Sequence, residues 1–179
     1  MSADDPGPLD RDLADPGASA PTIHATALVV HSPLARAPRG VLVTGPSGSG
    51  KSAFALALMD EWRAAGRFAA LVADDRTVLA ARNGRLIAAV PPALAGLVEV
   101  RGLGLRRVPH ATSAVMHLHV ALGRPSERMP DPAASCFHGV EVPRIVAANA
   151  PAALPLLRAR LLHAPVEAMA DGSRPDDGA

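Results

Sequence analysis

The sequence predicts an α/β fold in which a mixed β-sheet, a β-hairpin and a closing C-terminal helix form one domain. Three observations favour this fold. The apolar run 41–44, a glycine-rich loop and an amphipathic segment follow one another in the order strand, loop, helix. Asn83-Gly84 separates two short apolar runs, which is the strongest short-range signal for a hairpin. The Ala-Leu-Arg stretch 150–163 has the composition of a helix.

The first helix is predicted over 51–65, directly after the glycine-rich loop. Phe54, Leu58 and Trp62 recur at four-residue spacing, so their side chains share one apolar face of this helix. Gly66 then ends the helix, because glycine readily adopts the left-handed conformation that follows a last helical turn.

Apolar or alternating runs bounded by turn residues predict the strands of the sheet. They span 22–30, 41–44, 68–73, 77–81, 86–90, 97–101, 113–122 and 140–147. The strands on either side of the first helix can pair in parallel but need not. Gly102-Leu103-Gly104 is predicted to be a flexible segment. Pro155 fits in the first turn of the last helix if that helix begins late.

Length and composition favour one compact domain between two disordered tails. A chain of 179 residues can bury most of its apolar surface, and a hydrophobic content of 49% offsets the entropy lost on ordering. Residues 1–21 are acidic and rich in proline and glycine, and both this segment and 165–179 are predicted to be disordered. The domain is therefore expected over 22–164.

The charge balance and the single cysteine exclude several classes of protein. The 18 basic and 17 acidic residues nearly cancel, so no strong field indicates nucleic acid or an anionic membrane as partner. Cys136 has no second cysteine with which to form an internal disulfide. The sequence shows neither an apolar run of about 20 residues nor the layout of a secretory signal. We therefore expect a cytoplasmic protein that binds neither nucleic acid nor membrane.

The glycine-rich loop matches the pattern G-x-x-x-x-G-K-[ST] of a phosphate-binding loop (P-loop) and lies between a strand and a helix, as that motif requires. Its predicted nucleotide-binding residues are Gly45, Pro46, Ser47, Gly48, Ser49, Gly50, Lys51 and Ser52. The glycines allow backbone N–H groups to curve around phosphates, and the helix N-terminus adds partial positive charge. Lys51 is expected to reach the β and γ phosphates, and the Ser52 hydroxyl is expected to coordinate Mg²⁺. A loop built only to turn the chain would need neither side chain.

Two further groups of charged residues follow the P-loop in the sequence. Asp74 and Asp75 come directly after strand 68–73, where a carboxylate can hold Mg²⁺ or accept a substrate proton; a solvated turn is the alternative. Glu99 and Arg101 are two residues apart and so share one face of an extended segment. They could contact Mg²⁺ and phosphate there, although a surface ion pair explains them equally well.

Taken in order, the segments GPSGSGKS, LVADD and VEVRGLG resemble the catalytic domain of the HPr kinase/phosphorylase family over 22–163. The match is to a short form that lacks the separate N-terminal domain of that family. The resemblance implies a P-loop kinase-like fold that uses ATP and Mg²⁺. It also implies transfer of the γ-phosphate to a serine of the small phosphocarrier protein HPr, which regulates the phosphotransferase system. A homo-oligomer, specifically a hexamer, is implied as well.

The resemblance also assigns roles to individual residues. Asp75 is similar to the general base that takes the proton of the attacking serine, and Ser52 and Glu99 are similar to the metal ligands. His24 stands where the family carries a histidine of the catalytic site, although a histidine within a strand is often structural. Arg128 resembles a later active-site arginine of the family.

The sequence departs from the family pattern at two places. Ala53 stands where the family usually has an acid. The late loop associated with dephosphorylation corresponds to 142–146, which lacks its glycine, so phosphorolysis is expected to be weak or absent. Two alternatives stay open: a small-molecule P-loop kinase, and a nucleotide-gated regulatory module with little turnover.

His117 and His119 lie two residues apart on one face of the predicted strand 113–122. Such a pair can bind a metal ion if a third ligand is near. Because no cysteine or acid cluster accompanies them, we expect solvent-facing or hydrogen-bonded core histidines instead.

Overall fold

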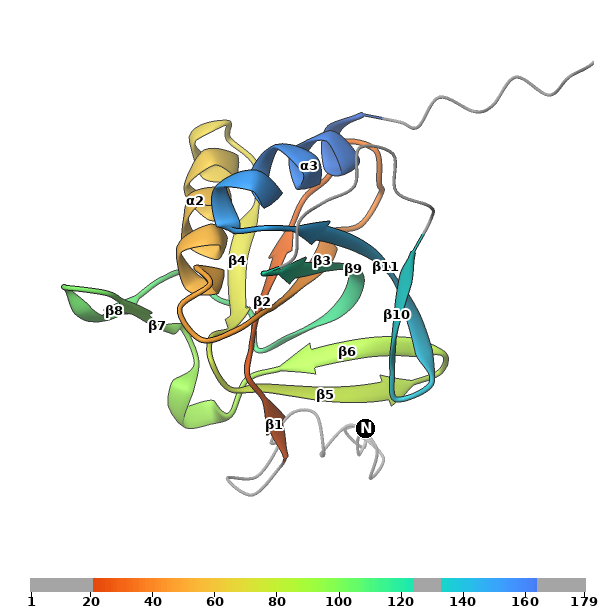
Figure 1. Cartoon of the computed structure of the whole chain (residues 1–179), viewed down its shortest axis with the longest axis horizontal. Coiled ribbons are helices and arrows are strands. Elements are labelled where there is room, and N and C mark those ends of the chain that lie inside the picture. Colours follow the sequence, from red (N-terminus) through yellow and green to blue (C-terminus); the bar gives the residue numbers. More distant parts are fainter. Residues whose placement is uncertain (1–20, 124–132, 164–179) are drawn as a thin grey trace, which may run out of the picture.

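The structure is a computed structural model that describes residues 21–123 and 133–163 (Figure 1). Except for Pro21, the predicted tails 1–21 and 165–179 lie outside the described residues, and so does Arg128. Within the two described ranges, neither α-helix has the length and apolar character that crossing a bilayer requires.

The elements alternate between short strands and two longer helices. In chain order they are β1 (Thr22–Ile23), β2 (Ala25–Val30), β3 (Arg39–Thr44), α2 (Lys51–Ala64), β4 (Ala69–Ala73), β5 (Thr77–Arg82), β6 (Arg85–Ala89), the 3₁₀-helix η1 (Pro92–Leu94), β7 (Leu97–Val100), β8 (Gly104–Arg107), β9 (Ser113–Leu122), β10 (Ala134–Phe137), β11 (Val140–Ala147) and α3 (Ala150–Leu162).

The main sheet is mixed, as the sequence predicts. Its strands follow the order β1-β5-β6-β9-β3-β2-β4, with β11 paired to β9 and β10 paired to β11. Strand β9 pairs in parallel with β3 and β11, whereas β2 pairs in antiparallel fashion with both β3 and β4. The strands on either side of α2 are therefore not neighbours, because β2 lies between them.

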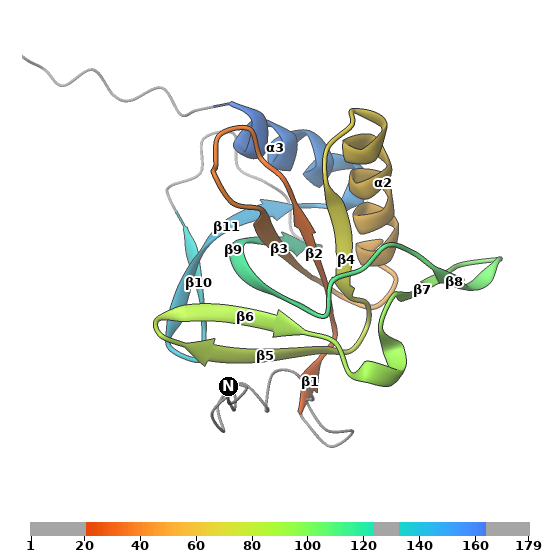
Figure 2. The same ribbon diagram turned by 180° about the vertical axis from the view of Figure 1, so that it is seen from behind.

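Helices α2 and α3 pack side by side on one face of the sheet (Figures 1 and 2). The predicted apolar face of α2 is buried against the sheet, with Phe54, Leu58 and Trp62 each at most 2% exposed. A second apolar cluster fills the opposite face, where the β5–β6 hairpin and β11 contribute Leu79, Leu86 and Val142. The sheet thus carries a core on both faces and holds the β3–α2 connection rigidly.

Two turns illustrate how local sequence decides the chain path. Asn83 and Gly84 join β5 to β6 with φ angles of 48° and 70°, so the predicted hairpin is confirmed. The segment predicted to be flexible is instead the turn of a second hairpin, β7–β8, which projects from the body of the domain (Figure 1). Gly102 and Gly104 make that turn possible, with φ angles of 82° and 75°.

Helix α3 begins at Ala150, as the predicted range 150–163 has it, so the late start that would place Pro155 in the first turn does not occur. Asn149 caps the helix, because its side chain accepts a hydrogen bond of 3.0 Å from the Ala152 amide. Pro151 occupies the first turn, where its missing N–H costs nothing. Pro155 consequently lies inside the helix and not in its first turn.

His119 is a buried core histidine with both ring nitrogens hydrogen-bonded. Nε2 lies 2.7 Å from the Thr44 hydroxyl at the base of the P-loop, and Nδ1 lies 2.8 Å from the Ser135 hydroxyl on β10. The ring meets Phe137 edge to face at 5.1 Å. Burial, with a smaller effect of the Arg144 charge, lowers the pKa of His119 to about 4.

This lowered pKa predicts that the domain loses stability in acid. The unfolded histidine titrates near its usual pKa of about 6.5, so below that pH the unfolded state binds more protons than the folded state. Stability is therefore fully present above about pH 6.5 and falls by on the order of 3 kcal/mol as the pH approaches 4. Urea midpoints between pH 7.5 and pH 4.5 should show this decline, and His119→Gln should flatten it. An imidazole NMR resonance of His119 that titrates near pH 6.5 would contradict the prediction.

Candidate active site

The P-loop lies between the end of β3 and the start of α2 (Figure 1). Gly48 and Gly50 have φ angles of 77° and 92°, which glycine adopts without strain. Gly50 is the N-cap of α2, and no side chain caps this helix. The first amide groups of α2 are therefore free of a capping side chain and lie at the positive end of the helix dipole. This combination is typical of an anion site.

Further features of the loop fit a phosphate group. The Ser49 hydroxyl is buried and has no hydrogen-bond partner among the described residues. A Cβ atom at Gly45 would lie 2.8 Å from that hydroxyl and 2.9 Å from the Leu122 carbonyl oxygen, so only glycine leaves the loop its present shape. A Cβ atom added at Gly48 would lie 3.7 Å from a guanidinium nitrogen of Arg101. The Arg101 side chain therefore brings a positive charge close to the loop. Unsatisfied donors and positive charge converge here.

Lys51 is folded back onto its own loop. Its ammonium group donates to the carbonyl oxygens of Gly45 and Pro46, each at 3.1 Å, and it lies 2.8 Å from His24 Nε2. The residue is only 6% exposed. Burial lowers the pKa of Lys51, while the nearby charges of Asp75 and Asp74 act in the opposite direction.

His24 interrupts the predicted strand 22–30, which the structure divides into β1 and β2. The strand prediction is wrong at this residue. Because Lys51 donates to Nε2, the neutral ring carries its proton on Nδ1. That nitrogen lies 2.6 Å from Asp75 Oδ1 and donates to it. Asp75 has a left-handed φ of 66°, an unusual conformation for this residue type.

Asp74 turns to the other side of the site. Its Oδ1 atom accepts hydrogen bonds from the Ser52 hydroxyl at 2.8 Å and from the Thr26 hydroxyl at 2.7 Å. Thr26 belongs to no motif of the sequence, although it is the only polar residue of strand β2. Thr26 is completely buried, and its hydroxyl holds a carboxylate beside the P-loop serine.

Replacing Thr26 with valine is expected to destabilise the domain by about 2 kcal/mol, because the half-buried Asp74 carboxylate loses a hydroxyl donor. Thr77→Val is the matched control, since Thr77 is equally buried but donates at 2.7 Å to the neutral carbonyl of Ala25. That variant should lose about 1 kcal/mol. Urea denaturation of both variants measures the difference, and equal losses would argue against a special role of Thr26.

The structure separates Glu99 from Arg101. Strand β7 ends at Val100, so Arg101 lies in the following turn and the two side chains do not share an extended face. This corrects the sequence prediction. Arg101 reaches the P-loop beside Gly48, whereas the Glu99 carboxylate forms no hydrogen bond or ion pair with any described residue.

The structure says less about the remaining predicted site residues, which are the metal ligands and Arg128. In residues 21–123 and 133–163, no three histidine, cysteine or acidic side chains gather in a metal-binding arrangement. Of the predicted metal ligands, Ser52 and Asp74 are in contact. Arg128 lies outside the described residues. The structure therefore brings Lys51, His24 and Asp75 into one hydrogen-bonded series and Ser52 and Asp74 into another.

Known proteins are similar to this chain at the level of sequence and structure. The family model for the HPr serine kinase C-terminal domain matches residues 22–115. The HPr kinase/phosphorylase of Clostridium tetani is 44% identical over 70 residues, which are 39% of this chain and 21% of that protein. The enzyme of Lacticaseibacillus casei is 43% identical over 67 residues, or 37% of this chain and 19% of that protein.

A solved structure extends the similarity to most of the chain. The Hpr(Ser) kinase/phosphatase from Coxiella burnetii has a TM-score of 0.61 and 32% sequence identity. The alignment covers 79% of this chain and 93% of that one. By contrast, the matched part of this chain spans about a fifth of the length of the curated relatives. The family model covers more than half of the chain, and with the solved structure it shows that this protein belongs to the HPr serine kinase C-terminal domain family.

Proposed function

We propose that this domain is an ATP- and Mg²⁺-dependent protein kinase that phosphorylates a serine of HPr. One observation carries the proposal: hydrogen bonds join the P-loop lysine to a carboxylate through one imidazole. Lys51 lies 2.8 Å from His24 Nε2, and His24 Nδ1 lies 2.6 Å from Asp75. A group that binds phosphate and a group that accepts protons are thus two hydrogen bonds apart. The relatives named HPr kinase/phosphorylase support HPr as the acceptor.

In the proposed reaction, the serine oxygen of HPr forms a bond to the γ-phosphorus of ATP. The bond between that phosphorus and the β–γ bridging oxygen breaks, and ADP leaves. Asp75 accepts the proton that the serine hydroxyl loses. The Asp75 side chain is 68% exposed, so a protein substrate can reach it. His24 orients Asp75 by donating its Nδ1 proton to the carboxylate.

The phosphates are bound by the P-loop amides, by Lys51 and by Arg101 in this proposal. Ser52, Asp74 and Glu99 are the residues that would hold Mg²⁺. When bound, the cation neutralises charge on the phosphate oxygens. The Thr26 hydroxyl keeps Asp74 in place for this role.

The decisive experiment incubates the purified protein with radiolabelled ATP, Mg²⁺ and HPr from the same organism. The expected product is phosphoserine on HPr, with one ADP released for each phosphoserine formed. HPr in which the acceptor serine is alanine should stay unlabelled. Nucleotide binding without labelling of HPr would indicate a nucleotide-gated regulatory module. ADP release with small metabolites alone would indicate a small-molecule kinase.

The proposal also covers the direction of the reaction, the oligomeric state of the protein and its place in the cell. We expect phosphorolysis to be weak or absent, which incubation of phospho-HPr with inorganic phosphate would test. Pro143 and Arg144, which correspond to the loop associated with dephosphorylation, lie within strand β11. A homo-oligomer, a hexamer by family resemblance, would act in the cytoplasm on the phosphotransferase system, and light scattering gives its mass.

A further inference from the structure

A second cavity lies at the opposite end of β3 from the P-loop. It has a volume of about 250 Å³ and is lined by residues of the β2–β3 connection and of β3, β9, β11 and α3. Arg39 lies at this end of β3 and Thr44 lies at the P-loop end. At about 3.3 Å per residue, these two positions are roughly 16 Å apart. The cavity is therefore separate from the candidate active site.

Two guanidinium groups line this cavity without a compensating acid. Arg39 is half-buried and comes from β3, while Arg160 is exposed and comes from the last turn of α3. Neither side chain forms a hydrogen bond or an ion pair with another residue in 21–123 or 133–163. Among the residues that the structure describes, no aspartate or glutamate lines the cavity. A half-buried guanidinium without a partner, such as that of Arg39, is costly, and a bound anion would offset this cost.

His117 adds a third nitrogen donor to the wall. Its Nδ1 atom accepts a hydrogen bond of 3.1 Å from the Gly40 amide, so the neutral ring carries its proton on Nε2. Burial first, and then the charges of Arg39 and Arg85, lower the pKa of His117 against an opposing interaction with the Val115 backbone. Positive charge is therefore concentrated around this ring.

The remaining polar group of the wall is already satisfied. The buried Ser32 hydroxyl donates to the Leu161 carbonyl oxygen at 2.6 Å and accepts from the Leu34 amide at 3.2 Å. This hydrogen bond satisfies a carbonyl oxygen at the negative end of the α3 dipole. Without a donor, that oxygen would repel an anion. Among the side chains described, the donors of this wall that are left for a ligand are those of Arg39 and Arg160 and the second ring nitrogen of His117.

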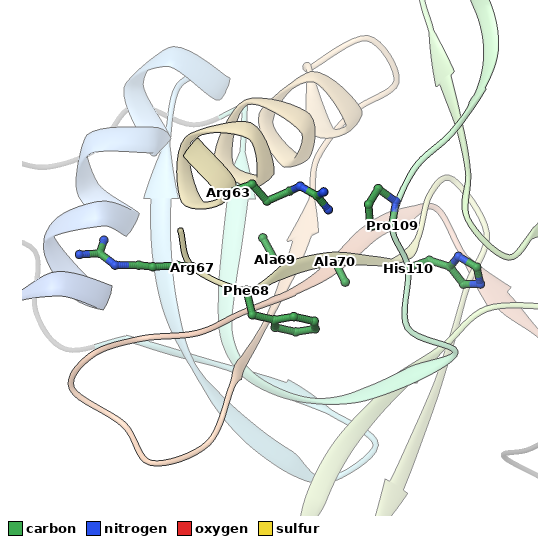
Figure 3. Close-up of a pocket in the computed structure, with 7 residues that line it drawn as sticks. All are labelled: Arg63, Arg67, Phe68, Ala69, Ala70, Pro109 and His110. Atoms are coloured by element: carbon green, nitrogen blue, oxygen red, sulfur yellow. The ribbon is translucent and has the colours of Figure 1, made fainter. Parts of the chain in front are cut away.

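A second depression lies elsewhere on the surface. It lies between the end of α2, the start of β4 and the segment before β9, and it is also lined by two arginines and a histidine. Figure 3 shows Arg67 pointing away from Arg63 and from His110. A single small anion cannot engage Arg67 together with Arg63, because the two side chains diverge.

We propose that the cavity lined by Arg39, His117 and Arg160 binds the phosphoryl group of a small molecule. Two guanidinium forks and an imidazole N–H offer more donors than the two oxygens of a carboxylate can pair with in forked geometry. A phosphoryl group has additional acceptor oxygens. The cavity volume accommodates such a group, and its position places the ligand on the strand that carries the P-loop at its other end.

The test is an NMR titration of ¹⁵N-labelled protein with inorganic phosphate, read at single amides. The Gly40 amide should shift along a saturating curve, because its acceptor His117 contacts the ligand. Amides of the P-loop report the candidate active site separately in the same spectra. Arg39→Gln and Arg160→Gln should each weaken the Gly40 response about tenfold and leave the P-loop response unchanged.

The matched control is Arg36→Gln, since Arg36 is exposed on the same connection but does not line the cavity. Its titration should equal that of the parent protein. The proposal fails if chloride at equal ionic strength or acetate at equal concentration reproduces the Gly40 shift. It also fails if Arg160→Gln, an exposed position whose substitution preserves folding, binds phosphate as tightly as the parent.

Discussion

Replacing Asp75 with asparagine is expected to slow serine phosphorylation of HPr by a factor of about 10²–10⁴ while ATP binding changes little. Asparagine has the shape of aspartate, and its side-chain oxygen can still accept the hydrogen bond from His24 Nδ1. It cannot accept the proton of the serine hydroxyl. The left-handed backbone at this position tolerates asparagine as well as aspartate, so the local structure should persist.

The measurement is a single-turnover assay with radiolabelled ATP, combined with calorimetric titration of the nucleotide. Asp60→Asn provides the control, because it makes the same change of charge at an exposed position of α2. That variant should phosphorylate HPr at the parent rate. If Asp75→Asn retained more than a tenth of the parent rate, Asp75 would not be the general base.

Replacing Gly40 with alanine should destabilise the fold by roughly 3 kcal/mol, because strand β9 leaves no room for a side chain. A Cβ atom there would lie 2.9 Å from the Val115 carbonyl carbon and would overlap its oxygen. It would also lie 2.5 Å from the end of the Met116 side chain, which can move, whereas the Val115 backbone is fixed in the sheet. Strands β3 and β9 would have to separate at the start of β3, the end remote from the P-loop.

Urea denaturation tests this prediction, with a lower midpoint and an unchanged slope as the expected result. Gly66→Ala separates steric overlap from backbone strain. Gly66 has a φ of 71°, but nothing lies within 4 Å of its added Cβ, so about 1 kcal/mol is expected there. If the two variants lost equal stability, the packing of Gly40 against β9 would not be the cause.

The features that could be predicted from the sequence are those with local signals. The P-loop motif, the spacing of Phe54, Leu58 and Trp62, and the Asn83-Gly84 turn each reside within a few consecutive residues, and each has its expected surroundings in the structure. Local propensity and hydrophobic periodicity decide such elements with little tertiary help.

The features that could not be predicted depend on which segments pair as strands. Strand β8 exists because Leu105 pairs with Glu99, and β10 exists because Cys136 pairs with Glu141, in each case across a short turn. The insertion of β2 between β3 and β4 is a long-range choice that no single segment encodes.

Two details of the site follow the same rule. The strand is interrupted at His24, and the His24 side chain contacts Lys51 and Asp75. Both partners lie 27 or more residues further along the chain. Thr26 was overlooked because a threonine suits a strand without any functional reason, and only its contact with Asp74 reveals its role.

The folded-back position of Lys51 has a consequence for how any phosphate enters the loop. An ammonium group has three protons, and three acceptors already surround this one: the Gly45 and Pro46 carbonyls and the His24 ring. A phosphate oxygen can therefore join only by displacing one of them. Nucleotide affinity at this lysine is an exchange of one set of hydrogen bonds for another, so the gain is smaller than the count of new contacts suggests.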